Sequence, residues 1–146
     1  MEKKYKLTEE TINVANRTLY RIEALKDFAN IKKGDKGGFI ENEENLSQSD
    51  NCWIYYDTKV YDNARVLDNA KVYGNAKIYG YALVGENAKV FDNAMVRGKV
   101  DVYGNARIYD NAQVSGNTQV FEDAVIYGNA RVYGYALVCD NTKLCD

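Results

Sequence analysis

An aliphatic residue recurs at every sixth position through most of the chain. The series begins at Ile54 and reaches Leu144 through sixteen consecutive hexads without an insertion or deletion. Two positions before each aliphatic residue stands a small one, usually alanine, and only Val100 is larger. Because side chains alternate between the two sides of a strand, each hexad is predicted to point one small and one aliphatic side chain inward. A period of six is not a helical period, so the pattern predicts short strands.

Asparagine punctuates the repeat three residues after the aliphatic position, in ten of fifteen cases, and glycine or aspartate usually precedes it. Asparagine tolerates the left-handed backbone region that a tight corner needs, so we expect it to form the corners. Strand plus corner in six residues closes a three-sided coil every eighteen. Residues 52–146 are then predicted to form about five coils, stacked at about 4.8 Å into a prism roughly 25 Å long.

The first 51 residues lack the repeat and are predicted to form a separate N-terminal capping segment. Residues 18–25 alternate like a strand, and Lys33–Gly38 forms a turn before another short strand at Phe39 and Ile40. Residues 8–11 could start a brief helix. The first coil of a solenoid exposes unpaired backbone, which a cap would cover. The C-terminal coil has no comparable cap in this sequence, so we expect an association surface there.

The repeat region, 52–146, resembles the hexapeptide-repeat superfamily, whose motif of an aliphatic residue followed four positions later by a small one is matched in nearly every hexad. The segments Gly37–Glu41, Asn45–Gln48 and Asn51–Ile54 are similar to those that introduce the repeats in YdcK-like transferases, a group found in bacteria and in phages or prophages. The resemblance implies an all-β fold, a left-handed parallel β-helix with a small β-rich cap. It also implies a phage or mobile-element origin as one alternative.

Residues eighteen apart should stack, which sorts the outward positions into columns. One face is predicted to carry an unbroken aromatic column just after the aliphatic position, made of Tyr55, Tyr73, Phe91, Tyr109 and Tyr127. The same face carries Trp53, Lys71, Lys89, Arg107 and Lys143 just before that position. Most acids of the repeat precede the corner asparagine. The faces are therefore expected to be basic and aromatic, and the edges acidic, although the net charge is only −2.

These two columns have both a structural and a functional interpretation. Tyrosine suits a strand surface and stacks well on itself, but a flat apolar stripe about 20 Å long also marks an interface, so we expect a dimer or trimer through this face. The cations could pair with the corner acids. Alternatively, because stacked cations repel one another, they could bind an anionic partner. Binding of single-stranded nucleic acid is disfavoured because the chain has no net positive charge.

Catalytic chemistry is poorly supported because the chain contains no histidine. The resemblance implies histidine as the general base of the acyltransferases and as the zinc ligand of the carbonic anhydrases with this fold. A corner acid such as Asp101 or Asp110, acting between subunits, is the remaining candidate base. Without histidine, Cys52, Cys139 and Cys145 make a poor zinc site, so we predict reduced thiols, no metal and no cofactor.

The sequence therefore predicts a non-catalytic binding or assembly module, and an acyltransferase-like protein with an unusual intersubunit site is the alternative. The phage resemblance implies a host factor as partner, in a counter-defence role such as an anti-CRISPR protein or a nucleotide sponge. No apolar run approaches the roughly 18 residues of a membrane span, and residues 1–6 lead into polar sequence, so a cytoplasmic protein without membrane contact is expected.

Overall fold

The computed structural model describes residues 2–146 and is almost entirely β-structure. The cap contains three longer strands, β1 (Tyr5–Val14), β2 (Arg17–Ala24) and β3 (Lys36–Ile40), followed by the short 3-10 helix η1 (Glu43–Asn45). The repeat region contains sixteen strands of two residues each. These are β4 (Trp53–Ile54), β5 (Lys59–Val60), β6 (Arg65–Val66), β7 (Lys71–Val72), β8 (Lys77–Ile78), β9 (Leu83–Val84), β10 (Lys89–Val90), β11 (Met95–Val96), β12 (Asp101–Val102), β13 (Arg107–Ile108), β14 (Gln113–Val114), β15 (Gln119–Val120), β16 (Val125–Ile126), β17 (Arg131–Val132), β18 (Leu137–Val138) and β19 (Lys143–Leu144).

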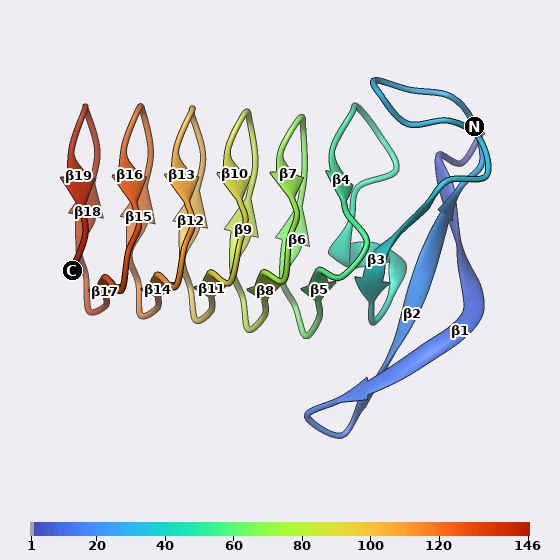
Figure 1. Cartoon of the computed structure of the whole chain (residues 1–146), viewed down its shortest axis with the longest axis horizontal. Coiled ribbons are helices and arrows are strands. Elements are labelled where there is room, and N and C mark those ends of the chain that lie inside the picture. Colours follow the sequence, from blue (N-terminus) through green and yellow to red (C-terminus); the bar gives the residue numbers. More distant parts are fainter. Residues whose placement is uncertain (1) are drawn as a thin grey trace.

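The short strands stack into three parallel sheets that form the sides of a solenoid (Figure 1). We call these sides the first face (β4, β7, β10, β13, β16, β19), the second face (β5, β8, β11, β14, β17) and the third face (β6, β9, β12, β15, β18). Partners on a face are eighteen residues apart, as for Lys89 and Arg107. The predicted three-sided parallel β-solenoid is confirmed, and its six-stranded first face corresponds to six coils.

The interior is filled by the two inward positions of each hexad. From Ile54 to Val138 every aliphatic residue of the series is buried, and so are the small residues from Cys52 to Ala130. Valine and isoleucine suit strands that are packed inside a sheet structure, and alanine leaves room at the narrow corners of the prism. The repeat spacing is therefore explained by the core that it fills.

The parallel stack begins upstream of residue 52. Strand β3 pairs in parallel with β5, placing Ile40 beside Val60, and Leu46 forms a parallel bridge with Val66. These partners lie twenty residues apart, whereas later partners lie eighteen apart, because the chain between Leu46 and Ile54 is two residues longer than a hexad. The predicted capping segment thus supplies part of the first coil, in addition to covering it.

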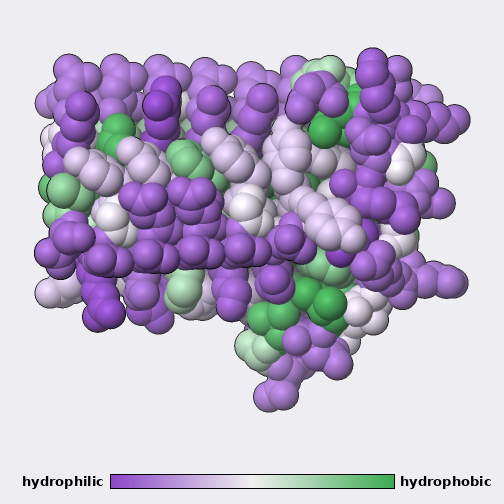
Figure 2. All heavy atoms as spheres, in the orientation of Figure 1, coloured by the Kyte–Doolittle hydropathy of each residue, from purple (hydrophilic) through white to green (hydrophobic). Residues whose placement is uncertain are grey.

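The cap itself is an antiparallel hairpin of β1 and β2 joined to β3 (Figure 1). The strands predicted within 18–25 and at 39–40 are present. The brief helix considered at residues 8–11 is wrong, because this segment lies inside β1, where its pairing with β2 outweighs local helix signals. Figure 2 shows mainly hydrophilic side chains over the solenoid in this view and a hydrophobic group at the projecting hairpin. There Ile12 and Val14 pack against a small cluster of Leu19, Phe39 and Tyr61.

Candidate binding site on the first face

The five predicted aromatic residues of the first face form one continuous column, which we call the aromatic ladder. The rings from Tyr73 to Tyr127 are stacked in parallel, with centroids 4.7, 4.8 and 5.5 Å apart. Tyr55 differs, since its ring is turned 83° from that of Tyr73 at 6.0 Å, and its hydroxyl donates to Oδ1 of Asn30 over 3.2 Å. Every ring of the ladder is half-buried, and burial raises the pKa of Tyr73.

Stacking decides which parts of the rings a ligand can reach. The faces of Phe91 and Tyr109 are each covered by neighbours at about the strand spacing, so these rings present their edges to solvent. Nucleobases bind to proteins by stacking on free aromatic faces. The ladder is therefore a strip of ring edges and does not provide a stacking platform along its length.

Beside the ladder runs the cation column, Lys71, Lys89 and Arg107, which are register partners on β7, β10 and β13. Lys71 and Lys89 are half-buried, and Arg107 is exposed. The considered pairing with corner acids is not found: among residues 2–146, none of the six ion pairs includes a member of this column. Three positive charges thus stack without a neutralising partner in the part of the chain that the structure describes.

Trp53 occupies the same repeat position as these cations, yet it does not face solvent. It is buried, and the rings of Tyr5 and Phe28 pack edge-on against it at 6.3 and 5.3 Å. The prediction that Trp53 lies on the open surface is therefore wrong, because the cap covers this end of the first face.

Two hollows adjoin the lysines of the cation column. One, of about 580 Å³, lies on the corner side and is lined by Ala29, the asparagines 51, 69, 87 and 105, Asp123 and the three cations. The other, of about 320 Å³, lies on the ladder side, between Asn30, Tyr55 and Tyr73. The cap residues Ala29 and Asn30 were not predicted as site residues, because no signal in the sequence shows that this loop reaches the first face.

The corner residues have a structural task that the sequence did not reveal. The left-handed conformation belongs to the residue before the asparagine. This residue is an acid at some corners, as at Asp92 (φ 57°) and Asp110 (φ 57°), and glycine at others. The prediction that asparagine adopts it is wrong. Six corner carboxylates, from Asp62 to Glu122, also accept a hydrogen bond from the backbone N–H eighteen residues later, over 2.7–3.2 Å. Acids at the corners therefore stabilise the contact between coils.

This role bears on the two acids considered as a general base. Asp110 accepts from the N–H of Gly128 over 2.9 Å, so one carboxylate oxygen is already occupied. Asp101 is not at a corner. It lies within β12 on the third face, between Leu83 and Gln119. The structure therefore does not bring these two acids together.

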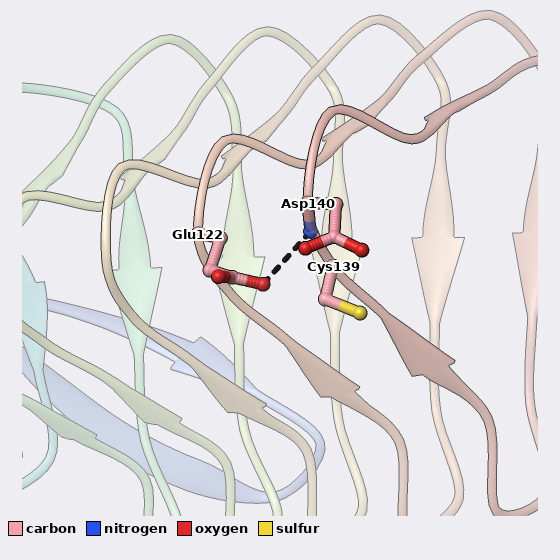
Figure 3. A group of neighbouring side chains, drawn as sticks. All are labelled: Glu122, Cys139 and Asp140. Carbon is pink, nitrogen blue, oxygen red and sulfur yellow. Dashed lines mark hydrogen bonds between the residues drawn. The ribbon is translucent and has the colours of Figure 1, made fainter.

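The three thiols differ in exposure, and none of them is in a disulfide within residues 2–146: Cys52 is buried, Cys139 is half-buried and Cys145 is exposed. Cys139 lies near the carboxylates of Glu122 and Asp140 (Figure 3). Glu122 accepts the N–H of Asp140 over 3.0 Å, as corner acids do throughout the solenoid. The repeat geometry accounts for this cluster without a metal ion.

Comparison with known proteins identifies the type of repeat. A family model described as the YdcK β-solenoid repeat matches residues 102–116, 106–122 and 124–140. The repeats of this chain are therefore similar to those of the YdcK β-solenoid family. An alignment over 61 residues, which covers 36% of the chain, shows 38% identity to a protein of Escherichia coli (strain K12) described as the uncharacterised acetyltransferase YdcK. The chain spans about a fifth of that relative, since the match covers 19% of its length.

The matched repeats lie within the solenoid, downstream of Lys71 and Lys89 of the cation column. They include Arg107 and the ladder residues Tyr109 and Tyr127. They do not include the cap loop at Ala29 and Asn30, which borders both hollows. The only helix among residues 2–146 is the three-residue η1, and none there is long and apolar enough to span a membrane.

Proposed function

We propose that this YdcK-like chain is a non-catalytic binding and assembly module that uses its first face. The observation that carries the proposal is the pairing, on one flat and uninterrupted side, of a half-buried aromatic ladder with three cations that have no ion-pair partner within residues 2–146. Interfaces commonly combine aromatic side chains and arginine at their centre.

Assembly through the ladder has a plain physical basis. Ring edges from Tyr73 to Tyr127 form a continuous strip, and a second copy lying on it would remove that strip from water. Lysines beside the strip would remain at the rim, where charge costs little. A dimer or trimer of this chain is therefore the proposed state.

Sedimentation velocity tests the assembly. The variant Tyr73→Asp/Tyr109→Asp places two charges on the strip and should shift an oligomer to monomer. The matched control is Tyr103→Asp/Phe121→Asp, which alters the corresponding stacked pair of the third face, with centroids 5.1 Å apart. A monomeric parent chain, or equal dissociation by both variants, would remove the ladder from the interface.

The second candidate is an acyltransferase-like protein with a site between subunits, and the description of the Escherichia coli relative as an acetyltransferase favours it. Against it stand the absence of histidine and the engagement of the corner carboxylates with backbone N–H groups. Equilibrium binding of acetyl-CoA distinguishes the two candidates, since tight stoichiometric uptake would contradict a non-catalytic module. The phage origin, the counter-defence role and a cytoplasmic location remain predictions from the sequence.

A further inference from the structure

The cation column of the first face is short and has defined ends. Trp53, under the cap, holds the equivalent position before Lys71, and Val125 holds it after Arg107 and separates the three cations from Lys143 on β19. Neighbouring strands lie about 4.8 Å apart, so the three positive side chains extend along roughly 10 Å of the solenoid axis. A line of this length suits a compact ligand with two or three charged groups better than a long polymer.

Charge within the column is uncompensated, in contrast to the cap. Arg17 pairs with Glu41 at 2.8 Å, and the buried Arg21 lies 2.8 Å from Glu10. The column cations have no such partner among residues 2–146, although stacking places like charges next to one another. Like charges that face each other across strands destabilise a sheet, and an anion between them would reverse the sign of that interaction.

Hydrogen-bond donors converge on the same end of the column. Asn51, Asn69 and Asn87 line the larger hollow with Lys71 and Lys89, and no side-chain hydrogen bond of theirs to protein is found within residues 2–146. One coil later, Asn105 donates to Asp123 over 3.3 Å, which uses the amide and places a carboxylate at that end. The hollow is therefore suited to oxygen anions near the lysines and repels them near Asp123.

We propose that Lys71, Lys89 and Arg107 bind a short oligophosphate chain that lies along the solenoid axis. Each tetrahedral phosphoryl group offers several acceptor oxygens, so one group can contact two cations of adjacent coils and a second group the next pair. The asparagine amides would donate to the remaining oxygens. An extended acidic peptide fits less well, because its side chains on one side repeat at about 6.6 Å, which exceeds the coil spacing.

The smaller hollow could hold an organic group attached to the phosphate chain. It lies against the same two lysines, between Asn30 and the turned ring of Tyr55, which leaves the regular stack of the ladder. A group attached to one end of the phosphate chain could occupy it. Free tripolyphosphate and a nucleoside triphosphate share the phosphate chemistry, and binding experiments can distinguish them.

Isothermal titration calorimetry on the full chain at low ionic strength tests this inference, with inorganic tripolyphosphate as the probe. We expect one molecule bound per chain and at least tenfold weaker binding by Lys71→Gln/Lys89→Gln. The matched control is Lys59→Gln/Lys77→Gln, which removes two lysines stacked in the same repeat position on the second face. The control should bind within twofold of the parent chain. The fluorescence of the buried Trp53 verifies folding of both variants.

Each other outcome has a defined meaning. No binding, or equal loss in both variants, would overturn the site, as would tighter binding of a single-stranded oligonucleotide. Binding of ATP more tightly than tripolyphosphate would support an organic ligand in the smaller hollow, and equal binding would support the inorganic chain. The inference rests on the first face as the binding face. However, loss of the oligomer in the ladder variant together with unresponsive calorimetry would remove only the anion site.

Discussion

The side-chain amine of Lys4 donates a hydrogen bond of 2.8 Å to the backbone carbonyl of Cys52, 48 residues further along the chain. The same amine lies 3.2 Å from the carbonyl oxygens of Ser49 and Asp50 and 5.0 Å from the ring centre of Phe28. Lys4 is buried, and this burial lowers its pKa. One lysine, directly before β1, therefore satisfies the carbonyls of the longer turn that begins the regular solenoid.

Replacing Lys4 by methionine should destabilise the cap. The apolar chain can still pack against Phe28, but the carbonyls of the turn lose their donor, which costs about 2–3 kcal/mol for hydrogen bonds to a charged group. Urea unfolding followed by the fluorescence of Trp53, the one tryptophan, measures the change. Lys6→Met, at an exposed position near the start of β1, is the control and should be nearly neutral.

Alkaline pH should release the cap. Burial raises the pKa of Tyr5, whose hydroxyl donates to the carbonyl of Leu46 over 2.5 Å, and burial also raises the pKa of Cys52. Because the folded pKa of Tyr5 exceeds its unfolded value, its contribution to stability is complete below about pH 10 and declines as the pH rises further. The lowered pKa of Lys4 has the opposite sign and offsets part of this loss.

A pH titration above pH 9, followed by the fluorescence of Trp53, measures the release of the cap. The Tyr5→Phe variant keeps the ring but has no ionisable hydroxyl, so its stability at neutral pH should be lower and its alkaline decline shallower. An identical alkaline profile for Tyr5→Phe and the parent chain would show that Tyr5 is not the titrating group.

At the corners, the carboxylate of Asp110 should stabilise the solenoid through the oxygen that accepts a hydrogen bond. Asp110→Asn keeps an oxygen for the N–H of Gly128 and tolerates the left-handed backbone, so the free energy of unfolding should change by less than about 0.5 kcal/mol. Asp110→Ala loses the acceptor and strains the backbone, which together cost about 2 kcal/mol. Thermal unfolding of the two variants compares them, and equal losses would contradict the role of the acceptor.

Replacing glycines of one corner column by alanine should cost different amounts of stability, depending on which atoms the added Cβ would meet in the next coil. A Cβ on Gly98 would meet the backbone nitrogen and oxygen of Gly116 at 2.9 Å, whereas a Cβ on Gly134 would meet no atom within 4 Å. Both have positive φ values, 72° and 78°. Gly134→Ala should therefore cost about 1 kcal/mol from backbone strain alone, and Gly98→Ala at least twice as much. Chemical denaturation of both variants tests the difference.

The sequence predicts the solenoid well because core and repeat are the same pattern. Each hexad from Ile54 onward fixes its own inward residues, so the parallel register follows from counting. The start of the solenoid is hidden because the turn after Leu46 breaks the count, although Leu46 occupies an inward position. Trp53 was placed on the surface because the repeat alone cannot show what the cap covers.

The candidate site also has one part that the repeat predicts and one part that depends on the cap. The aromatic ladder and the cation column follow from the eighteen-residue register, and the structure brings them together on one face. The hollows depend on the cap loop at Ala29 and Asn30, whose position is set by packing between distant segments. The corner acids could have been recognised from their spacing, since each lies eighteen residues before the N–H that it accepts.

Because each face repeats after three hexads, the length of the chain between two residues determines whether they share a side. An insertion of one complete hexad after Lys89 would leave the interior periodicity intact, yet it would turn everything downstream by one third of a revolution. Arg107 would then leave the column of Lys71 and Lys89. Duplications in such a protein therefore preserve its surface chemistry only in units of whole coils, whereas smaller duplications redistribute that chemistry without disturbing the fold.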